Sequence, residues 1–201
     1  MPSVTVGRLG QSEGGPTIRE GHGLVLASGG IDSSTLLALA RVEGLPPSAL
    51  FVDYGQAASA AEAVAVTAIC SQLGVPLYVV RCGGMSFGEG EIRGRNAFLL
   101  QTALMRLPWP SGTVLIGVHA GTGYRDCSPE FVELMQQSFD FHTGGAISVA
   151  APFVDWTKGE IYQLALRLGV PLRRTYSCEA GSVACNSCRS CLDRQALGLE
   201  S

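Results

Sequence analysis

Short apolar runs alternate with helical patterns along most of the chain, and this alternation is the strongest constraint on its fold. The apolar runs cover residues 24–27, 49–53, 77–81, 113–118 and a stretch near 147–150. Helical spacing of apolar residues covers residues 34–43, 57–73, 96–107 and 129–141. Crossovers of this length join parallel strands and place helices on the faces of the sheet. The sequence therefore predicts an α/β fold with a parallel sheet flanked by helices.

Composition narrows the class of protein. The chain has 201 residues, of which 46% are hydrophobic and 15% charged, so we expect an ordered globular body with a substantial core. It contains no apolar run of about 18 residues, and its first residues lack the apolar core of a signal peptide. We therefore expect a soluble, cytoplasmic protein with no membrane partner. The net charge of −3 argues against a direct nucleic-acid partner and favours small substrates.

We divide the chain into three parts. Residues 1–21 are rich in glycine and polar residues and are interpreted as a leader, with one strand at 4–6. Residues 22–172 form the main domain and end with a helix whose start at Thr157 and Glu160 has the pattern of a capping box. Residues 173–201 form a small C-terminal segment that contains most of the cysteines.

The stretch "LVLASGGIDSSTLLALARVEG", Leu24 to Gly44, places a glycine pair between a predicted strand and a predicted helix. Gly29 and Gly30 allow a sharp turn and a close approach of the backbone to a ligand. Free N–H groups at the helix start form an anion site. Hydroxyl groups that can add to this site come from Ser28, Ser33, Ser34 and Thr35. The stretch thus predicts a phosphate site, and the alternative is a plain turn in which Asp32 or Ser33 caps the helix.

Four cysteines cluster near the end of the chain. Cys178, Cys185, Cys188 and Cys191 follow the spacing C-x6-C-x2-C-x2-C. Because a chain without a secretory signal keeps its thiols reduced, a metal explains this cluster better than disulfides do. Four thiolates suit a structural, tetrahedral Zn²⁺ ion, and an iron–sulfur cluster is the alternative.

The combination of these motifs resembles a known family. "SGGIDS" at 28–33 resembles the loop of the N-type ATP pyrophosphatase (PP-loop) superfamily, and with the four cysteines the chain resembles the 7-cyano-7-deazaguanine synthase (QueC-type) family over residues 23–197. Further matching stretches are "VDYGQ", "GRN", "IGV", "GYRDCSPEFVELM", "PFVDWTKGEIYQLALRLGVPL" and "TYSC". The resemblance implies an adenine-nucleotide alpha hydrolase-like fold, a small C-terminal zinc-binding segment and a homodimer.

The resemblance also implies a reaction. ATP adenylylates the carboxylate of 7-carboxy-7-deazaguanine, and ammonia displaces AMP to give an amide. A second ATP activates the amide oxygen, and elimination leaves the nitrile. No nucleophilic side chain is needed, so the protein positions the reactants and stabilises charge. ATP, Mg²⁺ and Zn²⁺ are the implied cofactors.

Roles for individual residues follow from the same resemblance. The implied cofactor-binding residues are Ser28, Gly29, Gly30, Asp32, Ser33, Ser34, Asp53, Tyr54 and Gln56, with Asp32 as a ligand of Mg²⁺. The implied catalytic residues are Asp32, Arg95, Asn96 and Lys158, with Lys158 contacting phosphate. The implied substrate-binding residues are Gly94, Arg95, Asn96, Tyr124, Asp126 and Cys127.

One departure from the family leaves an alternative function open. After "DYGQ" the family carries basic and polar residues, whereas this chain reads "AASAAEAVAV". The alternative is a divergent relative that stops at the amide or joins the deazaguanine acid to another amine, including a protein acceptor, as in antiphage defence. A tRNA-modifying thiolase and a zinc-stabilised interaction module are further alternatives. The thiolase predicts a basic surface, and the interaction module predicts no ATP binding.

Overall fold

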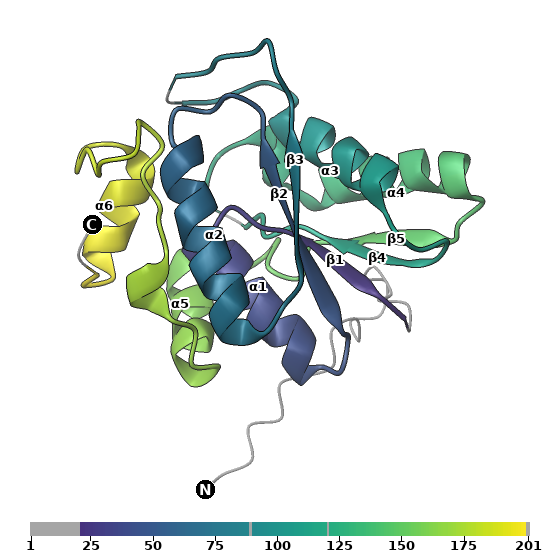
Figure 1. The fold of residues 1–201 in the computed structure, drawn as a ribbon, viewed down its shortest axis with the longest axis horizontal. Helices are drawn as coiled ribbons and strands as arrows, with labels where there is room; N and C mark the ends of the chain where they lie inside the picture. Colours follow the sequence, from purple (N-terminus) through teal and green to yellow (C-terminus); the bar gives the residue numbers. More distant parts are fainter. Residues whose placement is uncertain (1–20, 89, 120, 200–201) are drawn as a thin grey trace, which may run out of the picture.

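The computed structural model describes residues 21–88, 90–119 and 121–199, and Figure 1 shows a sheet with helices on both sides. Within these residues, strands β1 to β5 span Gly23–Leu26, Pro47–Asp53, Leu77–Arg81, Gly112–Leu115 and Ile147–Ala150. Helices α1 to α6 span Ile31–Val42, Ser59–Leu73, Arg95–Arg106, Pro129–Thr143, Lys158–Arg167 and Arg189–Ala196. Two 3₁₀ helices, η1 and η2, cover Arg125–Cys127 and Leu172–Arg174.

The strands form one parallel sheet in the order β3-β2-β1-β4-β5. In its register Leu24 of β1 pairs with Ser48 of β2 on one side and with Val114 of β4 on the other. Parallel neighbours require a crossover, which α1 to α4 supply between successive strands. The predicted α/β fold is confirmed.

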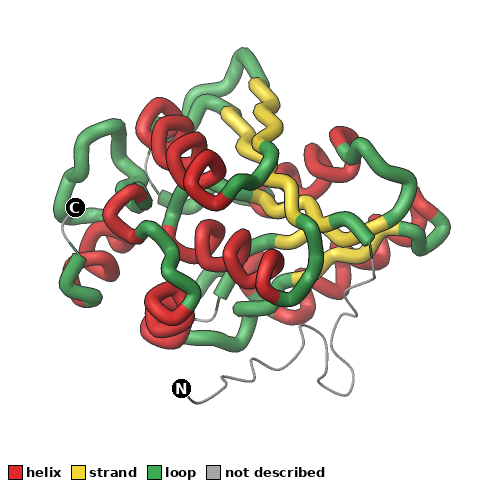
Figure 2. The backbone as a smooth tube through the Cα atoms, turned by 60° about the horizontal axis from the view of Figure 1, so that its bottom comes forward, coloured by secondary structure: helices red, strands yellow, loops and turns green. Residues whose placement is uncertain are grey.

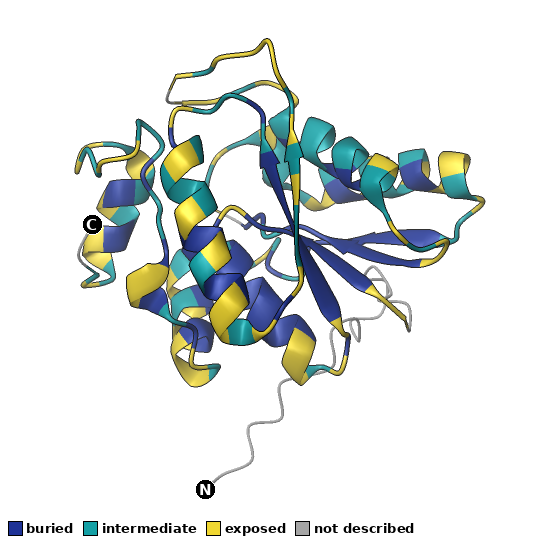
Figure 3. Cartoon of the chain, viewed as in Figure 1, coloured by how far each residue is buried: buried dark blue, intermediate teal, exposed yellow. Residues whose placement is uncertain are grey.

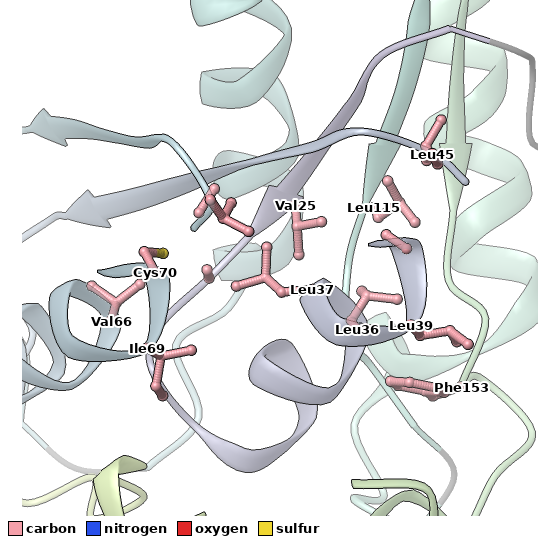
Figure 4. Close-up of a cluster of buried hydrophobic side chains, with 14 of the residues drawn as sticks. Val25, Leu36, Leu37, Leu39, Leu45, Val66, Ile69, Cys70, Leu115 and Phe153 are labelled. Atoms are coloured by element: carbon pink, nitrogen blue, oxygen red, sulfur yellow. The ribbon is translucent and has the colours of Figure 1, made fainter. Parts of the chain in front are cut away.

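Helices α1, α2 and α5 cover one face of the sheet, and α3 and α4 cover the other (Figures 1 and 2). Alternate residues of each strand point to opposite faces. Val25 therefore packs with Leu37 of α1 and Ile69 of α2 on the first face, as Figure 4 shows. Its neighbour Leu24 belongs to the second core cluster, which contains Phe139 of α4. Both core clusters contain strand residues, so side chains pack against the sheet on both of its faces.

Burial explains why the strand runs lack an alternating pattern. All residues of β1, β4 and β5 are buried, and β3, at one edge of the sheet, is only partly covered (Figure 3). A strand covered on both faces favours apolar residues along its whole length rather than at every second position. The continuous apolar runs are therefore a direct consequence of helices on both faces.

The element bounds differ from the expectations at a few positions. β3 and β5 span the predicted residues, whereas β4 ends at Leu115 and α1 begins at Ile31. Helix α6 was not expected from the sequence. The leader predicted at 1–21, with its strand at 4–6, lies outside the described residues except for Gly21. The boundary between 22–172 and 173–201 stays a prediction.

The C-terminal segment packs beside α2 and α5 (Figure 1). Its helix α6 is anchored by Arg194, whose side chain is buried at 6% exposure. Arg194 Nη1 donates to Thr175 Oγ1 at 2.7 Å, and Nη2 donates to the carbonyl of Leu172 at 3.2 Å. A buried guanidinium needs such partners. These bonds connect α6 to η2 and hence to the main domain.

Candidate active site and cysteine cluster

A cavity of about 210 Å³ opens at the carboxyl ends of the strands. From β1 the chain passes to β2 and β3 on one side and returns to β4 on the other side, so the connections diverge at β1. In open parallel sheets, ligands bind at this switch point. The predicted site residues that line the cavity are Ser28, Gly30, Asp32, Ser33, Tyr54, Gln56, Arg95 and Asn96.

The loop between β1 and α1 forms one wall of this cavity. Gly29 has φ of +79°, and a Cβ there would lie 2.7 Å from Ala65 Cβ in α2, so the position requires glycine. Gly30 is the N-cap of α1, and its carbonyl accepts a hydrogen bond from Ser34 Oγ at 2.6 Å. Ser33 Oγ donates to the same carbonyl at 3.3 Å. No side chain caps α1, so the N–H groups of its first turn are not bound by Asp32 or Ser33 and can bind an anion.

An ion pair lies beside this loop. Lys158, the first residue of α5, places Nζ 2.7 Å from both carboxylate oxygens of Asp32 in the first turn of α1. A capping box of Thr157 and Glu160 sets the start of α5 and hence the position of Lys158. His119 Nε2 lies 3.7 Å from Asp32 Oδ2. The pair places an ammonium group and a carboxylate next to the first turn of α1.

The end of β2 contributes a second wall. Gln56 Oε1 accepts a hydrogen bond from Tyr54 N at 2.9 Å, and Gln56 Nε2 donates to Glu62 Oε2 at 2.7 Å. Asp53 Oδ1 accepts from the backbone of Gly55 at 3.3 Å. Burial raises the pKa of Tyr54, and the charge of Arg95 opposes this shift. Tyr54 therefore keeps its proton and is available as a hydrogen-bond donor.

The start of α3 joins the cavity to the loop around η1. Gly94 is the N-cap of α3, and Arg95 and Asn96 follow it. Asn96 is buried at 3% exposure, and its Nδ2 donates to the carbonyl of Asp126 at 3.1 Å. The same nitrogen lies 3.9 Å from Cys127 Sγ. Residues 94–96 and 124–127 are thus connected, although Tyr124, Asp126 and Cys127 do not line the cavity described above.

Sequence reasoning did not assign two side chains of this site. Glu62, in the first turn of α2, lines the cavity. It is the single charged residue in the run from 57 to 66, which is the signal that was available in the sequence. His119 follows β4 and approaches Asp32, but no spacing relates the two residues.

The four C-terminal cysteines meet in space. The Sγ atoms of Cys178, Cys185, Cys188 and Cys191 all lie within 4.8 Å of one another, so one metal ion can contact all four. Hydrogen bonds from Ser187, from its side chain first and then from its backbone, lower the pKa of Cys185 to about 6. Since the thiolate is the form that binds metal, this turn favours ligation by Cys185, whereas burial raises the pKa of Cys191 to about 12. The donor set fits a tetrahedral metal site.

Backbone contacts connect the cysteine cluster to the cavity. Tyr176, two residues before Cys178, donates its N–H to the carbonyl of Gly29 at 3.0 Å. On another side, Arg189 Nη2 donates to the carbonyl of Gly121 at 3.4 Å. The cluster is therefore connected to the loop between β1 and α1 and to the loop that follows β4. No helix in the described part of the chain has the length and apolar character that a membrane crossing requires.

Solved structures share this fold at low sequence identity. A predicted subunit of tRNA methyltransferase from Methanocaldococcus jannaschii has a TM-score of 0.54 at 16% identity, covering 72% of this chain and 74% of that chain. NMN synthetase from Francisella tularensis has a TM-score of 0.51 at 17% identity, covering 90% of this chain and 78% of that chain. At these identities the similarity establishes the fold alone.

Other relatives are more similar to this chain in sequence than these two structures are. A 7-cyano-7-deazaguanine synthase from a Nostoc species is 35% identical over 215 residues, covering 88% of this chain and 94% of the relative. The protein of the same name from Ectopseudomonas mendocina is 34% identical, covering 86% and 91%. The one from Halobacterium salinarum is 34% identical, covering 85% and 88%. The profile of the family described as queuosine biosynthesis protein QueC matches residues 22–90 and 86–200. With this coverage and identity, the chain belongs to the QueC family.

Proposed function

We propose that this chain converts 7-carboxy-7-deazaguanine and ammonia to 7-cyano-7-deazaguanine with ATP, as an AMP-forming carbon–nitrogen ligase. The observation that carries the proposal is the name and coverage of the relatives, each a 7-cyano-7-deazaguanine synthase matched over at least 85% of this chain. The proposal is supported by a cavity of about 210 Å³ at the switch point of the sheet and by the uncapped N–H groups at the start of α1.

The proposed chemistry requires no nucleophilic side chain. A carboxylate is a poor acyl donor until one of its oxygens becomes part of a good leaving group, which adenylylation achieves. Ammonia then gives the amide, and a second adenylylation at the amide oxygen leads to the nitrile. Each step requires two reactants to be aligned while negative charge is stabilised. Lys158 lies beside the phosphate loop, and Arg95 lines the cavity, so both cations are suitably placed.

The residue roles divide the cavity into two sides. The nucleotide side comprises Ser28, Gly29, Gly30, Asp32, Ser33, Ser34, Asp53, Tyr54 and Gln56. The substrate side comprises Gly94, Arg95, Asn96, Tyr124, Asp126 and Cys127, and the bond from Asn96 to the Asp126 carbonyl supports this grouping. Asp32 is the proposed ligand of Mg²⁺, because hard cations prefer carboxylate oxygens. Binding of Mg²⁺ at Asp32 would release Lys158 for a phosphate oxygen.

The remaining parts of the proposal concern the metal and the assembly. The cysteine cluster would hold Zn²⁺ as a structural ion, since four thiolates leave no open position for a reacting water. When bound, the metal supplies folding free energy to the C-terminal segment. The enzyme would act as a homodimer in the cytoplasm.

A product assay tests the function. Purified protein is incubated with 7-carboxy-7-deazaguanine, ATP, Mg²⁺ and ammonium, and deazaguanine products are identified by mass spectrometry while AMP is quantified. We expect the nitrile, with one AMP released for each of the two activations. Asp32→Asn should abolish AMP release, whereas Asp155→Asn, at an exposed carboxylate next to the start of α5, should not. Amide with a single AMP would show a shortened reaction, and absence of AMP would refute the proposed acid substrate.

A further inference from the structure

Glu62 is a second carboxylate in the cavity, separate from the ion pair at Asp32. Both acidic side chains line the cavity, but Asp32 is neutralised by Lys158 at 2.7 Å. Among the described residues, no lysine or arginine lies within ion-pair distance of Glu62. Glu62 is half-buried, and the hydrogen bond from Gln56 offsets part of the cost of placing its charge on the cavity wall. A ligand in the cavity can therefore meet this carboxylate without competing with a cation for it.

Gln56 fixes the position of the Glu62 carboxylate. Its Nε2 donates to Glu62 Oε2 at 2.7 Å and to the carbonyl of Val52 at 3.2 Å, while its Oε1 accepts from Tyr54 N at 2.9 Å. Both amide hydrogens of Gln56 are thus used within the protein. In the described part of the chain, Glu62 Oε1 has no donor, so it keeps free acceptor capacity. Gln56 holds the carboxylate in place and leaves Glu62 to meet the ligand.

Neighbouring groups shift the pKa of the Glu62 carboxyl in opposite directions. Burial raises the pKa of Glu62, and the hydrogen bond from Gln56 and the positive charge of Arg95 lower it. Its place in the first turn of α2 also favours the charged form, because the helix dipole is positive there. A ligand that donates hydrogen bonds to both oxygens would stabilise the charged form further.

The chemistry of a carboxylate restricts what it can recognise. An ionised carboxylate only accepts hydrogen bonds, so its partner must present N–H or O–H groups. We propose that Glu62 is a specificity-determining residue that accepts hydrogen bonds from the amino edge of a purine-type base bound in this cavity. This inference rests on the proposed function, which supplies two such bases. They are the adenine of ATP, with its 6-amino group, and the deazaguanine acid, with N1–H beside a 2-amino group.

The test is equilibrium binding to the intact protein. Isothermal titration calorimetry is run with a non-hydrolysable ATP analogue and, separately, with 7-carboxy-7-deazaguanine. Glu62→Gln retains an acceptor for Gln56 but turns N–H donors toward the ligand. We expect it to weaken one of the two ligands by about tenfold to a hundredfold, the usual effect of losing a paired contact to a base edge. Glu133→Gln, at an exposed glutamate of α4, should change neither.

Two comparisons separate recognition from folding and identify the base. Glu62→Ala removes the acceptor without adding donors, so it should weaken binding less than Glu62→Gln; the reverse order would indicate a packing role and overturn the inference.

If ATP is the ligand concerned, Glu62→Gln should also shift the binding preference towards ITP, whose 6-oxo group accepts hydrogen bonds. If 7-carboxy-7-deazaguanine is the ligand concerned, Glu62→Gln should reduce the difference in affinity between this acid and its analogue without the 2-amino group. Unchanged affinity for both ligands would overturn the inference. If the wild-type protein binds neither ATP nor the deazaguanine acid, both this inference and the proposed function are refuted. If the wild-type protein binds both ligands but forms no product, only the proposed function is refuted.

Discussion

Replacing Lys158 by methionine should impair catalysis far more than it impairs folding. The side chain of Lys158 is 24% exposed and that of Asp32 is 20% exposed. Exposed ion pairs contribute about 0.2–1 kcal/mol, and removing one partner of a fully buried pair costs about 3–5 kcal/mol. For a pair at this intermediate exposure we expect Lys158→Met to lower the free energy of unfolding by about 1–2 kcal/mol.

The effect on activity has a different origin and should be larger. If the ammonium group stabilises charge on the phosphates as AMP is formed, its loss resembles the loss of one preorganised donor, which lowers kcat by about 10²–10³. AMP release under saturating ATP and acid measures this directly, and urea unfolding measures stability on the same preparations. Lys158→Arg should retain part of the activity, because it keeps the charge but changes its geometry.

A matched control separates charge from helix position. Glu160→Ala removes the capping box at the start of the same helix and should cost about 1 kcal/mol of stability, yet it leaves the ammonium group in place. We expect this control to keep most of the activity. Lys158→Met with kcat within threefold of the wild type would refute the role of the charge. Equal losses in both variants would show that the start of α5, rather than the ammonium, is what matters.

Three further outcomes follow from the same structure. Cys188→Ser should lower the zinc content measured by mass spectrometry and weaken ATP binding, since Tyr176 connects the cluster to the phosphate loop; Cys70→Ala should keep the metal. Gly29→Ala should cost about 2 kcal/mol in urea unfolding, against about 1 kcal/mol for Gly74→Ala, because both have positive φ but only Gly29 faces Ala65. The raised pKa of Glu62 means that the folded state binds the proton of this side chain more tightly than the unfolded state does. The protonated side chain therefore contributes stability at low pH, and this contribution is lost as the pH rises through the folded-state pKa. Glu62→Gln should therefore gain stability relative to the wild type as the pH rises above the ordinary pKa of glutamate, about 4.3, and a constant difference would contradict the assignment.

The sequence predicted the sheet well because burial on both faces leaves a clear signal. β3 and β5 match their apolar runs, whereas the run at 113–118 continues beyond the pairing of β4, which ends at Leu115. Ile116 and Val118 are buried too, but they line the cavity instead of extending the strand. An apolar run reports burial, and it does not report where the hydrogen-bonded ladder ends.

Helix starts and long-range pairs were harder to predict, for identifiable reasons. Asp32 and Ser33 are good caps, which favoured a later start for α1, but Gly30 is the N-cap and the hydroxyl of Ser33 donates to its carbonyl. Helix α6 gives little periodic signal, because the residues it buries are Cys191 and Arg194. The pairing of Lys158 with Asp32 joins residues that are 126 positions apart, and periodicity carries no information on such pairs.

The apolar run that sets this chain apart from its family pattern has a structural reason. Ala65 in that run approaches Gly29 so closely that a Cβ on the glycine would lie 2.7 Å from the alanine Cβ, and Val66 is buried beside it at 1% exposure. A long charged side chain at either position would displace the loop that contains Gly29. The single charge of the run, Glu62, lies on the cavity wall, where Gln56 holds it. The run therefore combines two tasks: its small residues support the backbone that would hold the phosphates, and its carboxylate would meet the base that we propose for this cavity. A lysine at position 65 should consequently reduce ATP binding, whereas a lysine at the 72%-exposed Val64 of the same helix should not.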